Sequence, residues 1–249
     1  MANSILEIKD LKREFIVGSE TVRALKGVSF NINAGEFVTI MGSSGSGKTT
    51  MLNILGCLDK PTDGDYILDG TNVKTLGKNE LARLRNRKIG FVFQSYNLLP
   101  RTTALENVEL PLLYNSEISA KDRYDRAKQA LEAVKLADRF DHTPAQLSGG
   151  QQQRVAIARA LVNEPVMILA DEATGNLDSR TSYEIMALMQ ELNQHKNMTI
   201  VFVTHEPDIA SFSGRTIMLR DGKLMSDTAN NNIRSAKDVL QSLPKTNDY

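Results

Sequence analysis

The chain has 249 residues, of which thirty are basic and thirty acidic, so its formal net charge is zero. That length suits one large α/β core, or a core with a smaller lobe attached. The balanced charge excludes an overall field that would favour nucleic acid or an anionic membrane surface, so we expect no direct nucleic-acid partner. The longest apolar runs, such as residues 166–170 and 200–203, are strand-length, and we expect no transmembrane segment.

The start of the chain and its cysteine content bear on the compartment. The first eight residues lack the basic segment and the long apolar stretch of a secretory signal. Cys57 is the only cysteine and cannot form an internal disulfide. A cytoplasmic, reducing environment therefore fits best.

The opening of the chain, residues 4–41, predicts a β-rich segment. Its apolar residues come in short pieces separated by turn signals, the pattern typical of strands. The apolar pieces are residues 5–8, 22–25, 28–32 and 37–41, and the turn signals are Gly18, Gly27 and Gly35.

A glycine-rich stretch follows the apolar run 37–41 and precedes a helix-like run at residues 50–55. Its pattern, G-x-x-x-x-G-K-[ST], predicts a phosphate-binding loop, because glycines at positive φ let successive N–H groups converge on an anion. We expect Lys48 to reach the outer phosphates and the Thr49 hydroxyl to ligate Mg²⁺. We expect positive φ at the three loop glycines. The predicted binding residues are Gly42, Ser43, Ser44, Gly45, Ser46, Gly47, Lys48, Thr49 and Thr50.

The middle of the chain changes character after a buried-type strand at residues 89–93. Before it, residues 66–68 predict a short strand and residues 79–85 a helix with Asn79 as its cap. Gln94 stands at the end of strand 89–93, where polar residues of open α/β sheets tend to face ligands. From residue 95 to 146 the apolar residues recur at helical spacing, which predicts an inserted helical subdomain.

Strand and helix alternate again from residue 166, which predicts a parallel sheet with helices on both faces. The expected strands are residues 166–170, 199–203 and 216–220, and the expected helices residues 181–192 and 208–212. We expect one domain over residues 1–249. It comprises a catalytic core with its β subdomain (1–94 and 147–226), the helical subdomain (95–146) and a polar tail (227–249) with a short helix near 236–242.

Asp171 and Glu172 follow the strand 166–170 directly. Phosphoryl transfer needs a carboxylate for magnesium and a group that positions water. We assign Asp171 to the metal and Glu172 to the attacking water as general base. An acidic pair at a strand end could also simply begin a turn, and the phosphate-binding loop favours the catalytic interpretation.

A second anion site is predicted where Leu147-Ser-Gly-Gly-Gln151 precedes a helix-like run. One triphosphate does not need two such sites from one chain. With these residues, and over about residues 4–226, the chain resembles the nucleotide-binding subunit of ATP-binding cassette (ABC) transporters. The resemblance implies the P-loop NTPase fold with an antiparallel β subdomain and an inserted helical subdomain, with ATP and Mg²⁺ as ligands.

The resemblance also implies a homodimer in the ATP-bound state. The Ser148, Gly149, Gly150 and Gln151 of one copy would close over the ATP held by the other. Gln94 matches the family's Q-loop, which touches metal and water, and His205 matches the switch histidine that senses the γ-phosphate. Asn176, Leu177 and Asp178 match the loop along the dimer seam.

Phe15 falls where the family places an aromatic ring against adenine, and a core phenylalanine is the competing interpretation. Two positions depart from the family pattern, since Ala173 stands where proline is usual and Glu206 where aspartate is usual.

Within the family, segments such as residues 54–61, 93–99 and 144–154 resemble the MacB/LolD group. That implies an ATPase on the inner face of the membrane, driving a separate permease for efflux or lipoprotein release. The permease would contact the helical subdomain, around residues 96–114, and the Q-loop. A regulator of the cell-division type shares all these motifs and stays open. An ATPase acting on nucleic acid or ribosomes is disfavoured, because the chain has one cassette, one cysteine and no heptad insert.

Overall fold

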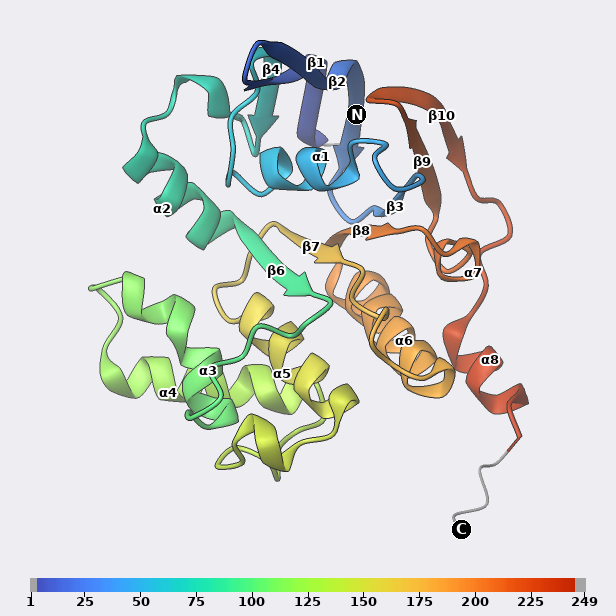
Figure 1. Ribbon diagram of the computed structural model, residues 1–249. Coiled ribbons are helices and arrows are strands. Elements are labelled where there is room, and N and C mark those ends of the chain that lie inside the picture. The colour runs from blue at the N-terminus through green and yellow to red at the C-terminus, as the bar shows by residue number, and fades with distance from the viewer. Residues whose placement is uncertain (1–3, 245–249) are drawn as a thin grey trace.

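The computed structural model describes residues 4–244, which form two β-sheets and the helices that cover them (Figure 1). An antiparallel sheet has the strand order β2-β1-β4-β5, and a mostly parallel sheet has the order β10-β9-β3-β8-β7-β6. The strands of the first sheet are β1 (Ser4–Val17), β2 (Glu20–Asn33), β4 (Asp63–Leu68) and β5 (Thr71–Asn72). Those of the second are β3 (Phe37–Met41), β6 (Ile89–Phe93), β7 (Met167–Asp171), β8 (Thr199–Thr204), β9 (Arg215–Arg220) and β10 (Lys223–Ala229).

Helices connect the parallel strands and fill the segment after β6. The helices are α1 (Lys48–Leu55), α2 (Lys78–Lys88), α3 (Ala104–Glu109), α4 (Ala120–Ala133), α5 (Gly149–Leu161), α6 (Ser179–Lys196), α7 (Pro207–Ala210) and α8 (Ala236–Ser242). Residues 95–146 contain helices and turns without a strand, as the helical spacing of their apolar residues predicts. The expected fold class, an α/β protein with these parts, is confirmed.

The parallel sheet separates two hydrophobic cores, because successive residues of a strand point to opposite faces. In β8, Ile200 and Phe202 face one core, whereas Val201 and Val203 face the other. The first core lies against α5, α6 and the helices of residues 95–146, and the second against α1 and the antiparallel sheet (Figure 1). Burial on both faces explains why these strands are continuous apolar runs.

Several element boundaries agree with the sequence and a few do not. The strands at residues 37–41 and 89–93 and the helix at 236–242 have the predicted bounds. Asn79 is not a cap: α2 begins after Gly77, whose backbone N–H donates to the Glu80 carboxylate at 2.7 Å. Gly27 is not a turn. It lies inside β2, where a Cβ would come within 2.5 Å of Asp10, itself at a register shift in β1.

The strand β10 is a difference at the end of the sheet. It pairs antiparallel with β9 at the edge of an otherwise parallel sheet. Its residues are mostly exposed and polar, so they carry no apolar alternation that would predict a strand. The end of the polar tail, residues 245–249, is outside the described residues.

Candidate active site

The glycine-rich loop joins the end of β3 to the start of α1, and its glycines serve different purposes. Gly45 and Gly47 have positive φ, of 77° and 101°, a region that favours glycine. Gly42 does not, which corrects the expectation for this residue. A Cβ on Gly42 would instead lie 2.4 Å from both the Leu219 carbonyl oxygen and Ser46 Oγ, so glycine is required there by close packing.

The loop fits a phosphate group. Ser46 Oγ is buried and has no hydrogen-bond partner among the described residues. No side chain caps the first N–H groups of α1, whose N-cap is Gly47, and unpaired N–H groups at a helix start bind anions. The Lys48 ammonium donates to the carbonyl oxygens of Gly42 and Ser43, at 2.8 and 3.0 Å, and so stays folded over the loop. Thr49 is exposed.

The predicted acidic pair lies at the carboxyl end of β7, next to β8 and β6 in the sheet. Burial, and then the charge of Glu172, raise the pKa of Asp171, while the nearby Lys48 opposes this shift. Because β8 pairs with both β7 and β3, Asp171 lies at the same edge of the sheet as the end of β3, where the phosphate-binding loop begins.

Glu172 has a left-handed backbone, with φ of 44°, which non-glycine residues seldom adopt. Its N–H donates to the Val203 carbonyl oxygen at 2.9 Å, which attaches it to β8. Its Oε1 lies 2.9 Å from Nδ1 of His205, just after that strand. The residue expected to act as general base and the histidine expected to sense phosphate are therefore in direct contact.

Gln94 follows β6 and makes a two-way contact with Asn176. Its Nε2 donates to Asn176 Oδ1 at 3.1 Å, and Asn176 Nδ2 donates to the Gln94 carbonyl oxygen at 3.2 Å. A side chain at position 175 would displace the Gln94 amide, because a Cβ on Gly175 would be 2.7 Å from Gln94 Nε2. The residue expected to contact the metal thus contacts the loop expected at the dimer seam.

At the start of α5, side chains of the same segment bond to two backbone N–H groups. Ser148 Oγ accepts from the Gln151 N–H at 3.3 Å, and Gln151 Oε1 accepts from the Ser148 N–H at 2.9 Å, which is a capping box. Gly149 is close to Leu177, and Gly150 would place a Cβ 2.5 Å from Thr181. Asp178 caps α6 by accepting from the Thr181 N–H at 3.0 Å. Residues 148–151 and 176–178 therefore form one surface.

The phosphate-binding loop and the start of α5 do not come together within one chain. In Figure 1 the loop lies beside α1 on one side of the parallel sheet, and the start of α5 lies on the other side. The residues that approach Gly149 and Gly150 most closely are Tyr96, Leu177 and Thr181, none of which belongs to the loop.

Phe15 lies near the exposed end of the β1–β2 hairpin and is 37% exposed. The Arg13 guanidinium stacks 4.4 Å from its ring centroid. The ring is therefore partly exposed and outside both hydrophobic cores of the described chain, which argues against the competing interpretation of a core phenylalanine.

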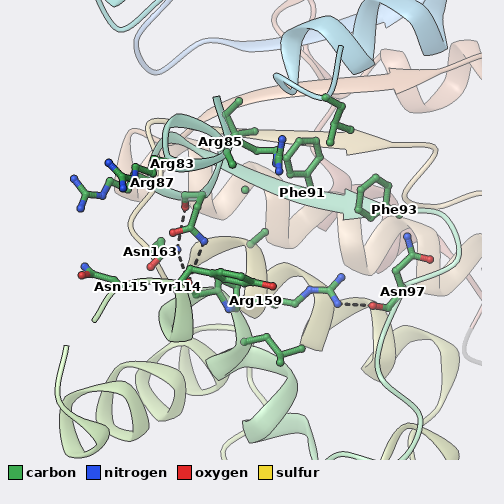
Figure 2. A pocket seen from close by; sticks show the side chains of 18 of the residues that line it. Arg83, Arg85, Arg87, Phe91, Phe93, Asn97, Tyr114, Asn115, Arg159 and Asn163 are labelled. Atoms are coloured by element: carbon green, nitrogen blue, oxygen red, sulfur yellow. Dashed lines mark hydrogen bonds between the residues drawn. The ribbon is translucent and has the colours of Figure 1, made fainter. Parts of the chain in front are cut away.

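Two features were not foreseen from the sequence. Gln153, on α5, is buried and hydrogen-bonds to backbone next to both Gln94 and Glu172. A groove of about 880 Å³ lies between α2, β6, α5 and residues 110–117 (Figure 2). In it, the Arg159 side chain donates to the carbonyl oxygens of Tyr96 and Asn97. Neither feature has a local signal, since a glutamine or arginine on a helix has the same sequence pattern wherever it points.

The fold and this arrangement define a phosphate-binding-loop nucleoside triphosphatase. The family model for the ABC transporter matches residues 25–175. An uncharacterized ABC transporter ATP-binding protein of Thermotoga maritima is 54% identical over 88% of this chain and 93% of its own. The macrolide export ATP-binding/permease protein MacB of Brucella melitensis is 50% identical over 95% of this chain, which spans only 36% of that protein.

The dimeric, post-hydrolysis structure of the ATP-binding cassette MJ0796 of Methanocaldococcus jannaschii, bound to ADP and Pi, is similar with a TM-score of 0.82. It shares 49% identity and covers 91% of this chain and 99% of its own. The chain therefore belongs to the ABC transporter family. It is an ATP-binding subunit of a transporter and an ATPase.

Proposed function

We propose that ATP is hydrolysed between two copies of this chain, each nucleotide being held by the loop 42–50 of one copy and residues 148–151 of the other. The observation that carries this is the separation of these two elements within one chain (Figure 1). A dimeric structure of the similar cassette MJ0796 supports it. Phe15 would stack on the adenine, since its ring is exposed and already pairs with a cation.

The residues at the ends of β6, β7 and β8 would carry the chemistry. Glu172 would accept the proton of the attacking water, and His205, 2.9 Å from it, would orient the carboxylate and contact the γ-phosphate. Lys48 would pair with the outer phosphates once a nucleotide replaces its bonds to the loop carbonyls. Residues 176–178 would lie along the seam between the copies.

Thr49, Gln94 and Asp171 would hold Mg²⁺ together with the phosphates. A hydroxyl, an amide oxygen and a carboxylate are the hard oxygen ligands that this ion prefers. Among residues 4–244 no group of three or more His, Cys, Asp or Glu could bind a metal, which agrees with an ion bound jointly with substrate. When bound, the ion neutralises charge on the phosphates.

The partner would be a membrane permease of the MacB/LolD type, with the chain at the inner face of the membrane. No helix within the described part of the chain is long and apolar enough to cross a bilayer. The groove in Figure 2 would receive a short cytoplasmic helix of the permease. Its wall includes Leu110 and Pro111, its rim includes Arg83 and Arg87, and Tyr114 at its edge is 84% exposed.

The Glu172→Gln variant tests the composite site. We expect it to bind ATP, to lose turnover and to accumulate as a dimer, because the base is removed while both binding elements remain. Sedimentation with ATP measures this, with Glu191→Gln, an exposed glutamate of α6, as the control that turns over normally. If Glu172→Gln with ATP sediments only as a monomer, the shared site is wrong. Copurification from membranes would identify the permease.

A further inference from the structure

Gln153 is a polar side chain in an apolar setting. It lies on the second turn of α5 and is completely buried. Its Nε2 donates to the Ala173 carbonyl oxygen at 2.7 Å and approaches the Phe93 carbonyl oxygen at 3.4 Å. Ala173 directly follows Glu172, and Phe93 directly precedes Gln94. A single amide group therefore joins α5 to the backbone beside both residues.

The backbone at Glu172 depends on such support. Its left-handed conformation, with φ of 44°, persists only where surrounding contacts hold it. On one side, its N–H is bonded to Val203 of β8. On the other, the next carbonyl, that of Ala173, is held by Gln153. Removing the amide would release one of these two anchors.

The second bond of Gln153 reaches the neighbouring strand end. Phe93 pairs with Asp171 in the parallel ladder between β6 and β7. The two carbonyls bonded by Gln153 therefore lie at the ends of adjacent strands, that of Phe93 in β6 and that of Ala173 two residues after β7. Gln94, the next residue, is held from the other side by Asn176. The position of Gln94 relative to Glu172 therefore depends on α5.

We propose that Gln153 is a positioning residue for ATP hydrolysis. The start of α5 completes the nucleotide site of the other copy. Through Gln153, the position of α5 also determines the positions of Gln94 and Glu172, which act on the nucleotide bound by their own copy. This inference rests on the composite site and residue roles proposed above. Gln153 itself touches no nucleotide, so its effect falls on turnover.

The chain offers a matched control in Gln190 of α6. Gln190 is also buried, and its Nε2 also donates to two carbonyl oxygens, those of Phe212 and Arg234, at 2.9 and 2.7 Å. Its bonds hold the segment before α8, away from Gln94 and Glu172. Gln190 Oε1 also accepts from the Ala236 N–H at 2.9 Å, whereas Gln153 Oε1 has no partner among the described residues. A merely structural loss should therefore be at least as large in Gln190→Met as in Gln153→Met.

The experiment measures kcat and KM for ATP and the melting temperature of the purified full chain. For Gln153→Met we expect kcat to fall at least about tenfold with KM within about twofold, because small displacements of reacting groups cost large factors in rate. For Gln190→Met we expect kcat within about twofold of the unmodified chain. Equal losses of kcat in the two variants, or a raised KM with unchanged kcat in Gln153→Met, overturn the proposal.

A milder variant keeps the test decisive if Gln153→Met does not fold. Gln153→Asn retains an amide but withdraws it by one methylene, so kcat should again fall with KM retained. An unchanged kcat in folded Gln153→Asn overturns the proposal. Glu172→Gln, measured alongside, distinguishes failure of the proposed function from failure of this inference. Normal turnover in Glu172→Gln contradicts the proposed catalytic role of Glu172. Lost turnover in Glu172→Gln, together with unchanged turnover in the Gln153 variants, contradicts only the role of Gln153.

Discussion

The starts of α1 and α5 are both glycine-rich, and the structure treats them differently. At α1 no side chain caps the helix, and the nearby Ser46 hydroxyl is buried without a partner among the described residues. At α5 the Ser148 hydroxyl and the Gln151 side chain satisfy each other's backbone N–H groups. The first helix start has unpaired groups that a phosphate can satisfy, whereas the capping box of the second already satisfies two of its leading N–H groups, those of Ser148 and Gln151.

This difference indicates an order of events. The loop before α1 already combines a cation, Lys48, with unpaired donors, so it can bind nucleotide in a single copy. In the proposed dimer, the start of α5 would gain a ligand only when a loaded second copy presents one, and its capping box would keep the helix stable until then. Nucleotide binding would thus precede closure of the dimer.

The largest expected effect is at the start of α1. Lys48→Ala should weaken ATP binding about 100-fold, because it removes charge-assisted contacts worth roughly 3 kcal/mol. Isothermal titration with ATP measures the loss. The matched control is Lys135→Ala, which removes an exposed ammonium paired with Glu191 and should bind ATP normally. Unchanged affinity in Lys48→Ala would mean that this loop is not the primary nucleotide site.

Substitution at the start of α5 should have a different effect. Ser148→Ala should lower the free energy of unfolding by about 1 kcal/mol, through loss of the cap, and leave ATP binding to single copies unchanged. Introduced into Glu172→Gln, it should weaken the ATP-dependent dimer about tenfold, as sedimentation can measure. Ser119→Ala removes the equivalent cap of α4 and should cost similar stability without affecting the dimer. Equal dimer affinities in Ser148→Ala and Ser119→Ala would contradict a role for the start of α5 in the dimer.

A smaller effect is expected at Phe15, which is proposed to stack on adenine. Phe15→Ala should weaken ATP binding about fivefold, equivalent to about 1 kcal/mol of lost stacking. The melting temperature should hardly change, because the ring is outside the core. Val17→Ala, which truncates another exposed side chain of β1, is the control. A lower melting temperature with equal ATP affinity would contradict stacking on adenine.

The smallest effect concerns the carboxylate of Asp171. Burial raises the pKa of Asp171, so the folded chain binds this proton more tightly than the unfolded chain, and the group destabilises the fold as pH rises through its folded pKa. Asp171→Asn should therefore raise the melting temperature at pH 7 by about 2 °C without nucleotide.

The pH dependence provides the check on Asp171→Asn. Below the carboxyl's ordinary pKa of 3.8, both folded and unfolded chains keep Asp171 protonated, and the difference from asparagine should disappear. Calorimetry at both pH values measures this. Asp227→Asn is a poor control because it breaks an ion pair with Arg215, so Asp125→Asn, at an exposed position of α4, is preferred. A variant less stable at pH 7 would show that Lys48 outweighs burial.

Local patterns carried much of the fold and of the site. The runs 37–41 and 89–93 predict strands because continuous apolar residues are needed where a strand is buried on both faces. The motif at residues 42–49 predicts its loop because glycine, lysine and threonine at that spacing supply what a phosphate needs. Other local signals do not match the structure. Gly27 suggests a turn, although a strand irregularity also accommodates glycine, and the exposed residues of β10 carry no alternation that would predict a strand.

The sequence by itself determined the family, the phosphate-binding loop and the residues available for catalysis, since these depend on residue types at short spacing. Only the tertiary structure decided that Glu172 contacts His205, that Asn176 holds Gln94, and that the buried Gln153 reaches two carbonyls from 20 and 60 residues away. Such partners are set by how the sheet and α5 pack together, and packing joins residues whose distance along the chain carries no information about their contact.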